Sequence, residues 1–178
     1  MAINNGKKFE KNFKESCKKS NILYERFVDS NKFGNNGVSR FTPENPCDGF
    51  IFHNNKLIYI ELKSTTTGSL SYNVPPNIKI KGKQFDIKPH QIQSLLERAE
   101  YSNVHCGLIV DFADRQTKTK IIKGGTYYIG VNDFFNYTFE SGKHSLNIDD
   151  AKSIGIEIPR SLKKVNYTYN IEDFLKKI

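Results

Sequence analysis

The chain has 178 residues, with 27 Lys and Arg against 19 Asp and Glu, so its formal net charge is +8. A hydrophobic fraction of 37% with 12% aromatic residues supplies a buried core, which argues against a disordered polycation. No run approaches the ~20 apolar residues of a membrane span and no apolar signal opens the chain, so we expect one cytoplasmic domain over residues 1–178.

The first expected element is a helix over residues 7–20. Phe9, Phe13 and Cys17 recur every four residues, so they lie on one face. Lysines cover much of the remaining surface: Lys7, Lys8, Lys11, Lys14, Lys18 and Lys19. Together with the net positive charge, these lysines favour a polyanionic partner, nucleic acid first. Glu10 lies next to the apolar face, where it either pairs with Lys14 one turn later or contributes to an acidic site.

Two strands are expected after an irregular connection rich in turn formers at residues 29–46. They cover residues 48–53 and 56–63 and flank Asn54-Asn55, a pair that tolerates the positive φ angles of a type I′ turn. The pattern therefore predicts a tight β-hairpin.

The rest of the chain alternates between helix and strand signals. A polar loop or partly ordered flap is expected at residues 64–82, a helix that opens at Pro89, and a central strand at 104–112 that is covered on both faces. Later patterns predict a strand pair at 119–122 and 126–131 that turns at 123–125, and helices near 133–140 and 171–177. This order predicts an α/β fold with a central mixed β-sheet flanked by helices.

The expected hairpin gathers a set of charged residues. If residues 54–55 form a two-residue loop, Asp48 falls directly across from Glu61, with Cβ atoms roughly 5 Å apart. Lys63 lies two residues beyond Glu61 and therefore on the same face. Directly opposed like charges destabilise a sheet, whereas Mg²⁺ prefers oxygen ligands and is commonly held by one or two carboxylates. The main-chain carbonyl of Leu62 offers a third oxygen.

Such a set suits the hydrolysis of a phosphodiester. Lys63 would orient or deprotonate the attacking water, or neutralise charge that develops on a phosphate. A structural interpretation stays open, in which Asp48 opens a turn and residues 61–63 form the solvated end of an edge strand. One additional loop residue at positions 54–55 would undo the pairing.

Other candidates carry weaker signals. Gln91, at the opening of the second helix, either reaches the site or caps the helix. Asp111 and Asp114 flank the end of an apolar strand, where turn-forming acids are routine. Three scattered cysteines lack disulfide or zinc spacing and are expected to be reduced: Cys17, Cys47 and Cys106. Three tyrosines are assigned to core packing rather than to base stacking: Tyr72, Tyr127 and Tyr128.

An Asp, twelve intervening residues and a Glu-x-Lys triplet, at Asp48 and residues 61–63, resemble the PD-(D/E)xK nuclease core. More narrowly, the chain resembles the RecU Holliday-junction resolvases of Gram-positive bacteria and their phages. Three further tracts carry this likeness: Gly6-Lys7-Lys8-Phe9-Glu10, His90-Gln91-Ile92, and Gly142-Lys143-His144-Ser145-Leu146 followed by Gly155. The interval between Tyr24 and Cys47 is shorter than the family's projecting stalk, which indicates a phage-encoded relative with a reduced stalk.

The resemblance implies a restriction-endonuclease-like core and a homodimer that nicks two strands of a four-way DNA junction symmetrically. It implies Mg²⁺, for which Mn²⁺ can substitute, bound by Asp48, Glu61 and the Leu62 carbonyl, with Lys63 serving the water and Glu10 completing the acidic cluster. DNA is expected along the first helix, on Lys7, Lys8, Lys11 and Lys14. Two alternatives stay open: the same core acting on a flap, a single strand or a specific duplex site, and a DNA- or partner-binding protein without turnover. A bacterial or phage-infected bacterial cell is the expected setting.

Overall fold

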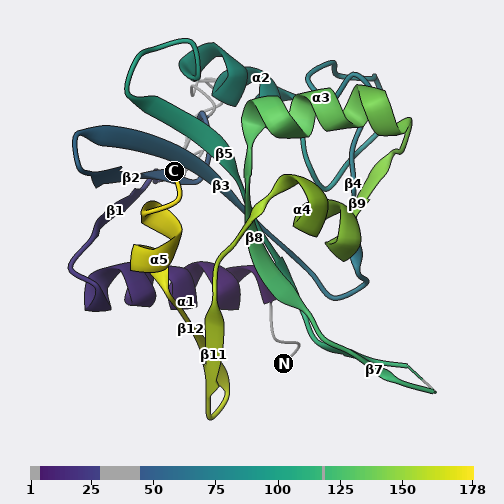
Figure 1. Ribbon diagram of the computed structural model, residues 1–178. Coiled ribbons are helices and arrows are strands. Elements are labelled where there is room, and N and C mark those ends of the chain that lie inside the picture. Colours follow the sequence, from purple (N-terminus) through teal and green to yellow (C-terminus); the bar gives the residue numbers. More distant parts are fainter. Residues whose placement is uncertain (1–4, 29–44, 118) are drawn as a thin grey trace, which may run out of the picture.

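A six-stranded sheet forms the centre of the computed structural model, which describes residues 5–28, 45–117 and 119–178 (Figure 1). The strand order is β1-β2-β3-β5-β8-β10; β3 and β5 are parallel, and the other neighbours are antiparallel. The strands span Leu23–Arg26 (β1), Gly49–His53 (β2), Lys56–Thr65 (β3), Val104–Phe112 (β5), Gly125–Gly130 (β8) and Ile156–Glu157 (β10). The predicted mixed sheet is confirmed.

Helices cover both faces of this sheet (Figure 1). They span Asn5–Lys19 (α1), Pro89–Arg98 (α2), Val131–Ser141 (α3), Ile148–Ile154 (α4) and Ile171–Leu175 (α5). One apolar core joins α1 and α5 to the face that carries Ile58, Ile60 and Ile109. The other core joins α2, α3 and α4 to the face that carries Leu108 and Val110. The alternation along β5 therefore buries that strand on both sides, as its apolar run predicts.

The sequence patterns of α1 and of the β2–β3 hairpin produce the expected structures. Phe9, Phe13 and Cys17 are buried on one face of α1. Asn54 and Asn55 have φ angles of 49° and 60°, the left-handed values that a type I′ turn requires at both positions. The hairpin therefore has the two-residue loop on which the predicted register depends.

The expected strand pair at 119–122 and 126–131 is wrong. β7 (Ile121–Ile122) pairs with β6 (Arg115–Gln116), whereas β8 pairs with β5. Gly124 passes so close to β5 that an added Cβ would lie 1.9 Å from the carbonyl oxygen of Phe112. The glycines at 124–125 thus permit a close backbone approach and do not form the predicted hairpin turn.

Several short elements have no clear sequence signal. They are β1, α4, β4 (Ser69–Ser71), β9 (Ser145–Asn147), β11 (Arg160–Lys163) and β12 (Asn166–Tyr169). β3 continues to Thr65 and β4 follows, so the expected loop at 64–82 is partly strand. Of the expected connection at 29–46, residues 29–44 lie outside the described part.

Two expectations about side chains hold in the described part of the chain. The three cysteines are free and buried. The three tyrosines that were assigned to the core are also buried. Among the helices of residues 5–28, 45–117 and 119–178, none has both the length and the apolar character needed to cross a membrane.

Candidate active site

The β2–β3 hairpin brings Asp48 and Glu61 together. The ladder ends at the Gly49–Ile60 pair, so Asp48 and Glu61 occupy the next position of the same register. Asp48 is held there by two hydrogen bonds: its carbonyl accepts one from the N–H of Phe27 over 2.9 Å, and its Oδ2 accepts one from the N–H of Leu62 over 2.8 Å. The two carboxylates therefore lie at one end of the hairpin, as the loop length predicts.

Lys63 and Gln91 hold the Glu61 carboxylate from the side of α2. The Lys63 ammonium lies 3.0 Å from Oε1 of Glu61 and also donates a hydrogen bond to Oε1 of Gln91 over 3.1 Å. The Gln91 amide donates to the same Glu61 oxygen over 2.5 Å. Gln91 also accepts a hydrogen bond from the N–H of Lys88, which caps α2. The Gln91 side chain thus caps α2 and contacts Glu61 at the same time.

Burial makes Glu61 an unusual carboxylate. Its side chain is 2% exposed, and Oε2 is buried with no hydrogen-bond partner in the described part of the chain. Burial raises the pKa of Glu61 from 4.5 to about 7; the nearby charge of Lys63 lowers this pKa, while repulsion from Asp48 raises it. A buried carboxylate oxygen without a donor is a place where a cation would be stabilised.

The donor set fits a hard divalent cation. It consists of Asp48, Glu61 and the main-chain carbonyl of Leu62. Leu62 lies past the last residue pair of the β2–β3 ladder, and its carbonyl is on the same strand edge as its N–H, which donates to Asp48. Within the described ranges, no group of three or more His, Cys, Asp or Glu side chains is arranged to hold a metal ion. Two carboxylates and a carbonyl suit Mg²⁺, which usually keeps several waters.

The structure does not gather Glu10 into one metal-sized group with the two carboxylates. Glu10 lies on α1, with its Oε2 3.3 Å from a guanidinium nitrogen of Arg26 in β1. Arg26 pairs with Gly49, next to Asp48 in sequence. Glu10 therefore stands at the border of the site, and Arg26 is a charged neighbour that sequence reasoning missed because β1 was not predicted.

Tyr24 also lies near this border. Burial raises the pKa of its hydroxyl, and the negative charges of Asp48 and Glu10 raise it further. The carboxylates of Asp48 and Glu10 are thus both close enough to affect one phenol, although Glu10, Asp48 and Glu61 do not form one metal-sized group among the described residues.

The four α1 lysines predicted to bind DNA lie apart from Gln91. Lys7, Lys11 and Lys14 are exposed and Lys8 is half-buried. Because α1 and α2 pack on opposite faces of the sheet, these lysines lie across the sheet from the α2 side of the site. Their contact with DNA stays a prediction.

Comparison with known proteins first defines the fold. The structure of the Holliday junction resolvase Hjc from the archaeal hyperthermophile Archaeoglobus fulgidus is similar, with a TM-score of 0.51 and 14% identity over 85% of this chain and 95% of that chain. The sheet, its flanking helices and this likeness show a restriction-endonuclease-like fold.

Sequence comparison then gives the family. The chain is 32% identical over 181 residues to the SPbeta prophage-derived uncharacterized protein YotM of Bacillus subtilis, a match that covers 94% of this chain and 83% of the relative. The chain belongs to the family of this prophage protein. No family model matches the chain.

Proposed function

We propose that the protein is a metal-dependent endodeoxyribonuclease that hydrolyses phosphodiester bonds in branched DNA. The observation that carries the proposal is the arrangement of Asp48, Glu61 and Lys63 around a buried carboxylate oxygen that lacks a donor. A simple turn does not require two acids beside one ammonium at the end of a hairpin. This set of charges suits a cation next to a phosphate.

Mg²⁺, or Mn²⁺ in its place, would be held by Asp48, Glu61 and the carbonyl of Leu62. When bound, the ion supplies positive charge that stabilises the negative charge developing on the phosphate. Glu10 is proposed to support the same site from its border, next to Arg26.

The remaining work falls to residues of the chain. Gln91 and Lys63 both contact Oε1 of Glu61, so the carboxylate cannot rotate freely. The direction in which Oε2 points is therefore fixed as well. Lys63 has three N–H donors, and contacts to Glu61 and Gln91 use two of them among the described residues. The third donor is available to orient a water or to neutralise a phosphate oxygen.

Four-way junctions are the proposed substrate, cut by paired symmetric nicks as in a RecU-type resolvase. The fold likeness to a Holliday junction resolvase and the net charge of +8 support this choice. Symmetric cutting needs two equivalent sites, so we propose a homodimer in which residues 1–178 of each copy form one nuclease domain. The proposed setting is the cytoplasm of a bacterial or phage-infected bacterial cell.

A cleavage assay on three DNA substrates tests the proposal. Four-way junction, flap and linear duplex are incubated with the protein in Mg²⁺, and then with EDTA. We expect nicks placed symmetrically across the junction, and no nicks in EDTA. Cleavage without branch preference would keep the nuclease and refute the junction substrate. DNA binding with no cleavage under Mg²⁺ or Mn²⁺ would refute the nuclease and leave a non-catalytic binding protein.

A further inference from the structure

Two narrow hairpins extend from the body of the molecule at the lower edge of Figure 1. One is formed by β6 and β7, and the other by β11 and β12; together we call them the hairpin fork. Three fork lysines are exposed: Lys120, Lys163 and Lys164. Residues 115–123 and 160–170 contain no Asp or Glu, so the charge of both hairpins is wholly positive.

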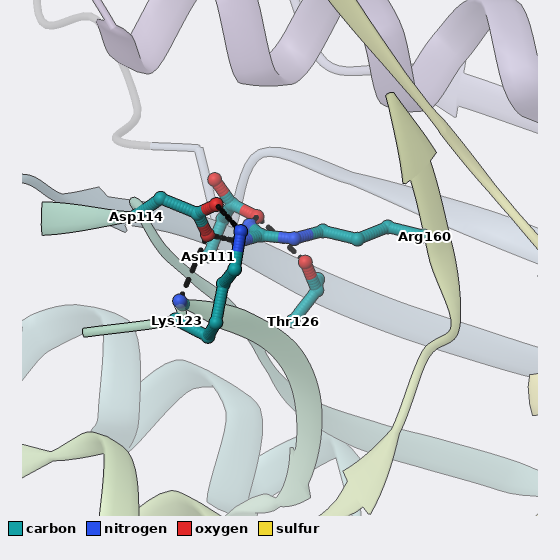
Figure 2. Close-up of polar contacts among 6 residues, drawn as sticks. Asp111, Asp114, Lys123, Thr126 and Arg160 are labelled. Atoms are coloured by element: carbon teal, nitrogen blue, oxygen red, sulfur yellow. Dashed lines mark hydrogen bonds and ion pairs between the residues drawn. The ribbon is translucent and has the colours of Figure 1, made fainter. Parts of the chain in front are cut away.

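A partly buried ion-pair network joins the two hairpins at their root (Figure 2). Arg160, the first residue of β11, donates to Asp111 over 2.6 Å and to Asp114 over 3.0 Å. Asp114 directly precedes β6 and also accepts the N–H of Gly124, which follows β7, over 2.9 Å. Thr126 donates to Asp111 over 2.6 Å. The Arg160 side chain is only 8% exposed, so this network fixes one hairpin relative to the other.

Asp111 and Asp114 therefore do more than form turns. Asp111 and Asp114 pair with Arg160 and Lys123 at the root, and the lysines farther along the fork have no acidic neighbours in the hairpin sequences. The network separates charge, with its acids at the sheet and the exposed cations farther out.

The fork lies beyond the candidate active site along the direction of the sheet. β3 and β5 are parallel, and Lys63 is level with Val110. Arg115, where β6 begins, comes five residues after Val110, which corresponds to roughly 17 Å at ~3.3 Å per residue of strand. Arg115 also donates to the carbonyl of Thr67 over 2.7 Å, which ties the fork to the chain that follows β3.

We propose that the hairpin fork binds the phosphate backbone of a duplex arm of the substrate, at or beyond about five base pairs from the bond that is cut, because the root of the fork lies roughly 17 Å from the level of Lys63 and each base pair spans ~3.4 Å. Lys120, Lys163 and Lys164 make the phosphate contacts. The inference rests on the proposed function for the identity of the substrate. A second copy of this chain is the less favourable occupant, because a copy that carries a net charge of +8 would meet cations of the same sign.

The test uses a Glu61→Gln background, in which DNA is bound but not cut. The fork variant combines Lys120→Gln, Lys163→Gln and Lys164→Asn; Asn suits position 164 because its φ is 58°. The matched control removes three exposed charges from α4 and from the end of the chain: Lys152→Gln, Lys176→Gln and Lys177→Gln. Dissociation constants are measured by fluorescence anisotropy over a range of salt, on four-way junctions with full-length arms and with arms truncated to about four base pairs.

On full-length arms, the log–log salt slope of the fork variant should fall by about 0.9 for each lost phosphate contact, hence roughly 3 in total, with a loss of affinity of 10- to 100-fold near 0.15 M salt. The control should change the slope by less than one contact. On truncated arms, the fork variant should bind like its parent within about twofold. Equal losses in fork and control variants, or an equal loss on both arm lengths, would overturn the inference.

Two further readouts keep this inference separate from the proposed function. Cleavage by the chain with Glu61 intact, combined with an unchanged salt slope in the fork variant, would refute the fork alone. An altered slope without any cleavage by the intact chain would refute the nuclease and leave the fork as a DNA contact. Sedimentation of the DNA-free protein addresses the other occupant: a dimer that dissociates on fork substitution would assign the surface to a second copy and overturn the DNA assignment.

Discussion

The side-chain amide of Gln91 donates to Oε1 of Glu61 over 2.5 Å, and this hydrogen bond connects the first turn of α2 to the middle of the hairpin strand β3. The same Gln91 accepts a hydrogen bond from Lys63 over 3.1 Å. One neutral side chain thus sets the orientation of an acid and an ammonium at once.

Gln91→Ala should lower kcat by about 10- to 100-fold, the usual cost of losing a residue that orients a metal ligand, with KM for DNA little changed. Gln93→Ala is the control, because Gln93 is exposed on the same helix and contacts Asn77 and Glu97 instead of the site. Steady-state cleavage of a four-way junction measures both. A change in KM alone would show that Gln91 contributes to binding and does not position Glu61.

The raised pKa of Glu61 makes stability depend on pH when no metal is present. The folded state binds this proton more tightly than the unfolded chain, since the pKa rises from 4.5 to about 7. The free energy of unfolding should therefore fall as pH rises from about 4.5 to 7, by up to roughly 3 kcal/mol, and then level off. Denaturant unfolding in EDTA measures it.

Glu61→Gln is the reference for this pH dependence, because it keeps the shape of the side chain without the titration. The wild type should become progressively less stable than Glu61→Gln over that interval. A difference between the two proteins that stays constant with pH would contradict the assigned burial of the charge.

Divalent metal should stabilise the folded protein through the same carboxylates. Mg²⁺ at 100 times its dissociation constant adds about 2.7 kcal/mol to the free energy of unfolding, so Tm should rise with Mg²⁺ concentration. Asp48→Asn should remove most of this rise. Asp149→Asn, which changes an acid that is 85% exposed on α4, should leave it intact. An equal rise in both variants would place the ion elsewhere.

Breaking the Asp111–Arg160 pair should be strongly destabilising, although apolar residues in place of both partners would often be as stable as the ion pair. Arg160→Met leaves Asp111 buried without its cation and should destabilise the protein by about 3–5 kcal/mol. Lys123→Met, whose side chain is 81% exposed, should cost less than about 1 kcal/mol. Chemical denaturation compares the two, and similar small losses would mean that the root network is solvated.

Local signals explain which parts of this fold were predictable. The Asn54-Asn55 turn fixed the loop length, and with it the meeting of Asp48 and Glu61. Pro89 marked the start of α2, which carries Gln91 to the site. Each of these features depends on residues that are close together in the chain.

The features that were missed depend on distant partners. β1 is four residues long and buries only Tyr24, so it has no alternating pattern. Arg160 meets Asp111 across a separation of 49 residues, which no local spacing reports. β8 leaves its expected partner because Gly124 can approach the backbone of Phe112, a contact that becomes visible only in three dimensions.

The most direct test of the central claim is single-turnover nicking of a labelled four-way junction by the wild type and by Glu61→Gln, with the dissociation constant of each measured on the same DNA. We expect Mg²⁺-dependent nicking by the wild type, no detectable nicking by Glu61→Gln, and DNA affinity that is retained or increased once a negative charge is removed. Glu61→Gln that nicks at the wild-type rate would contradict this expectation.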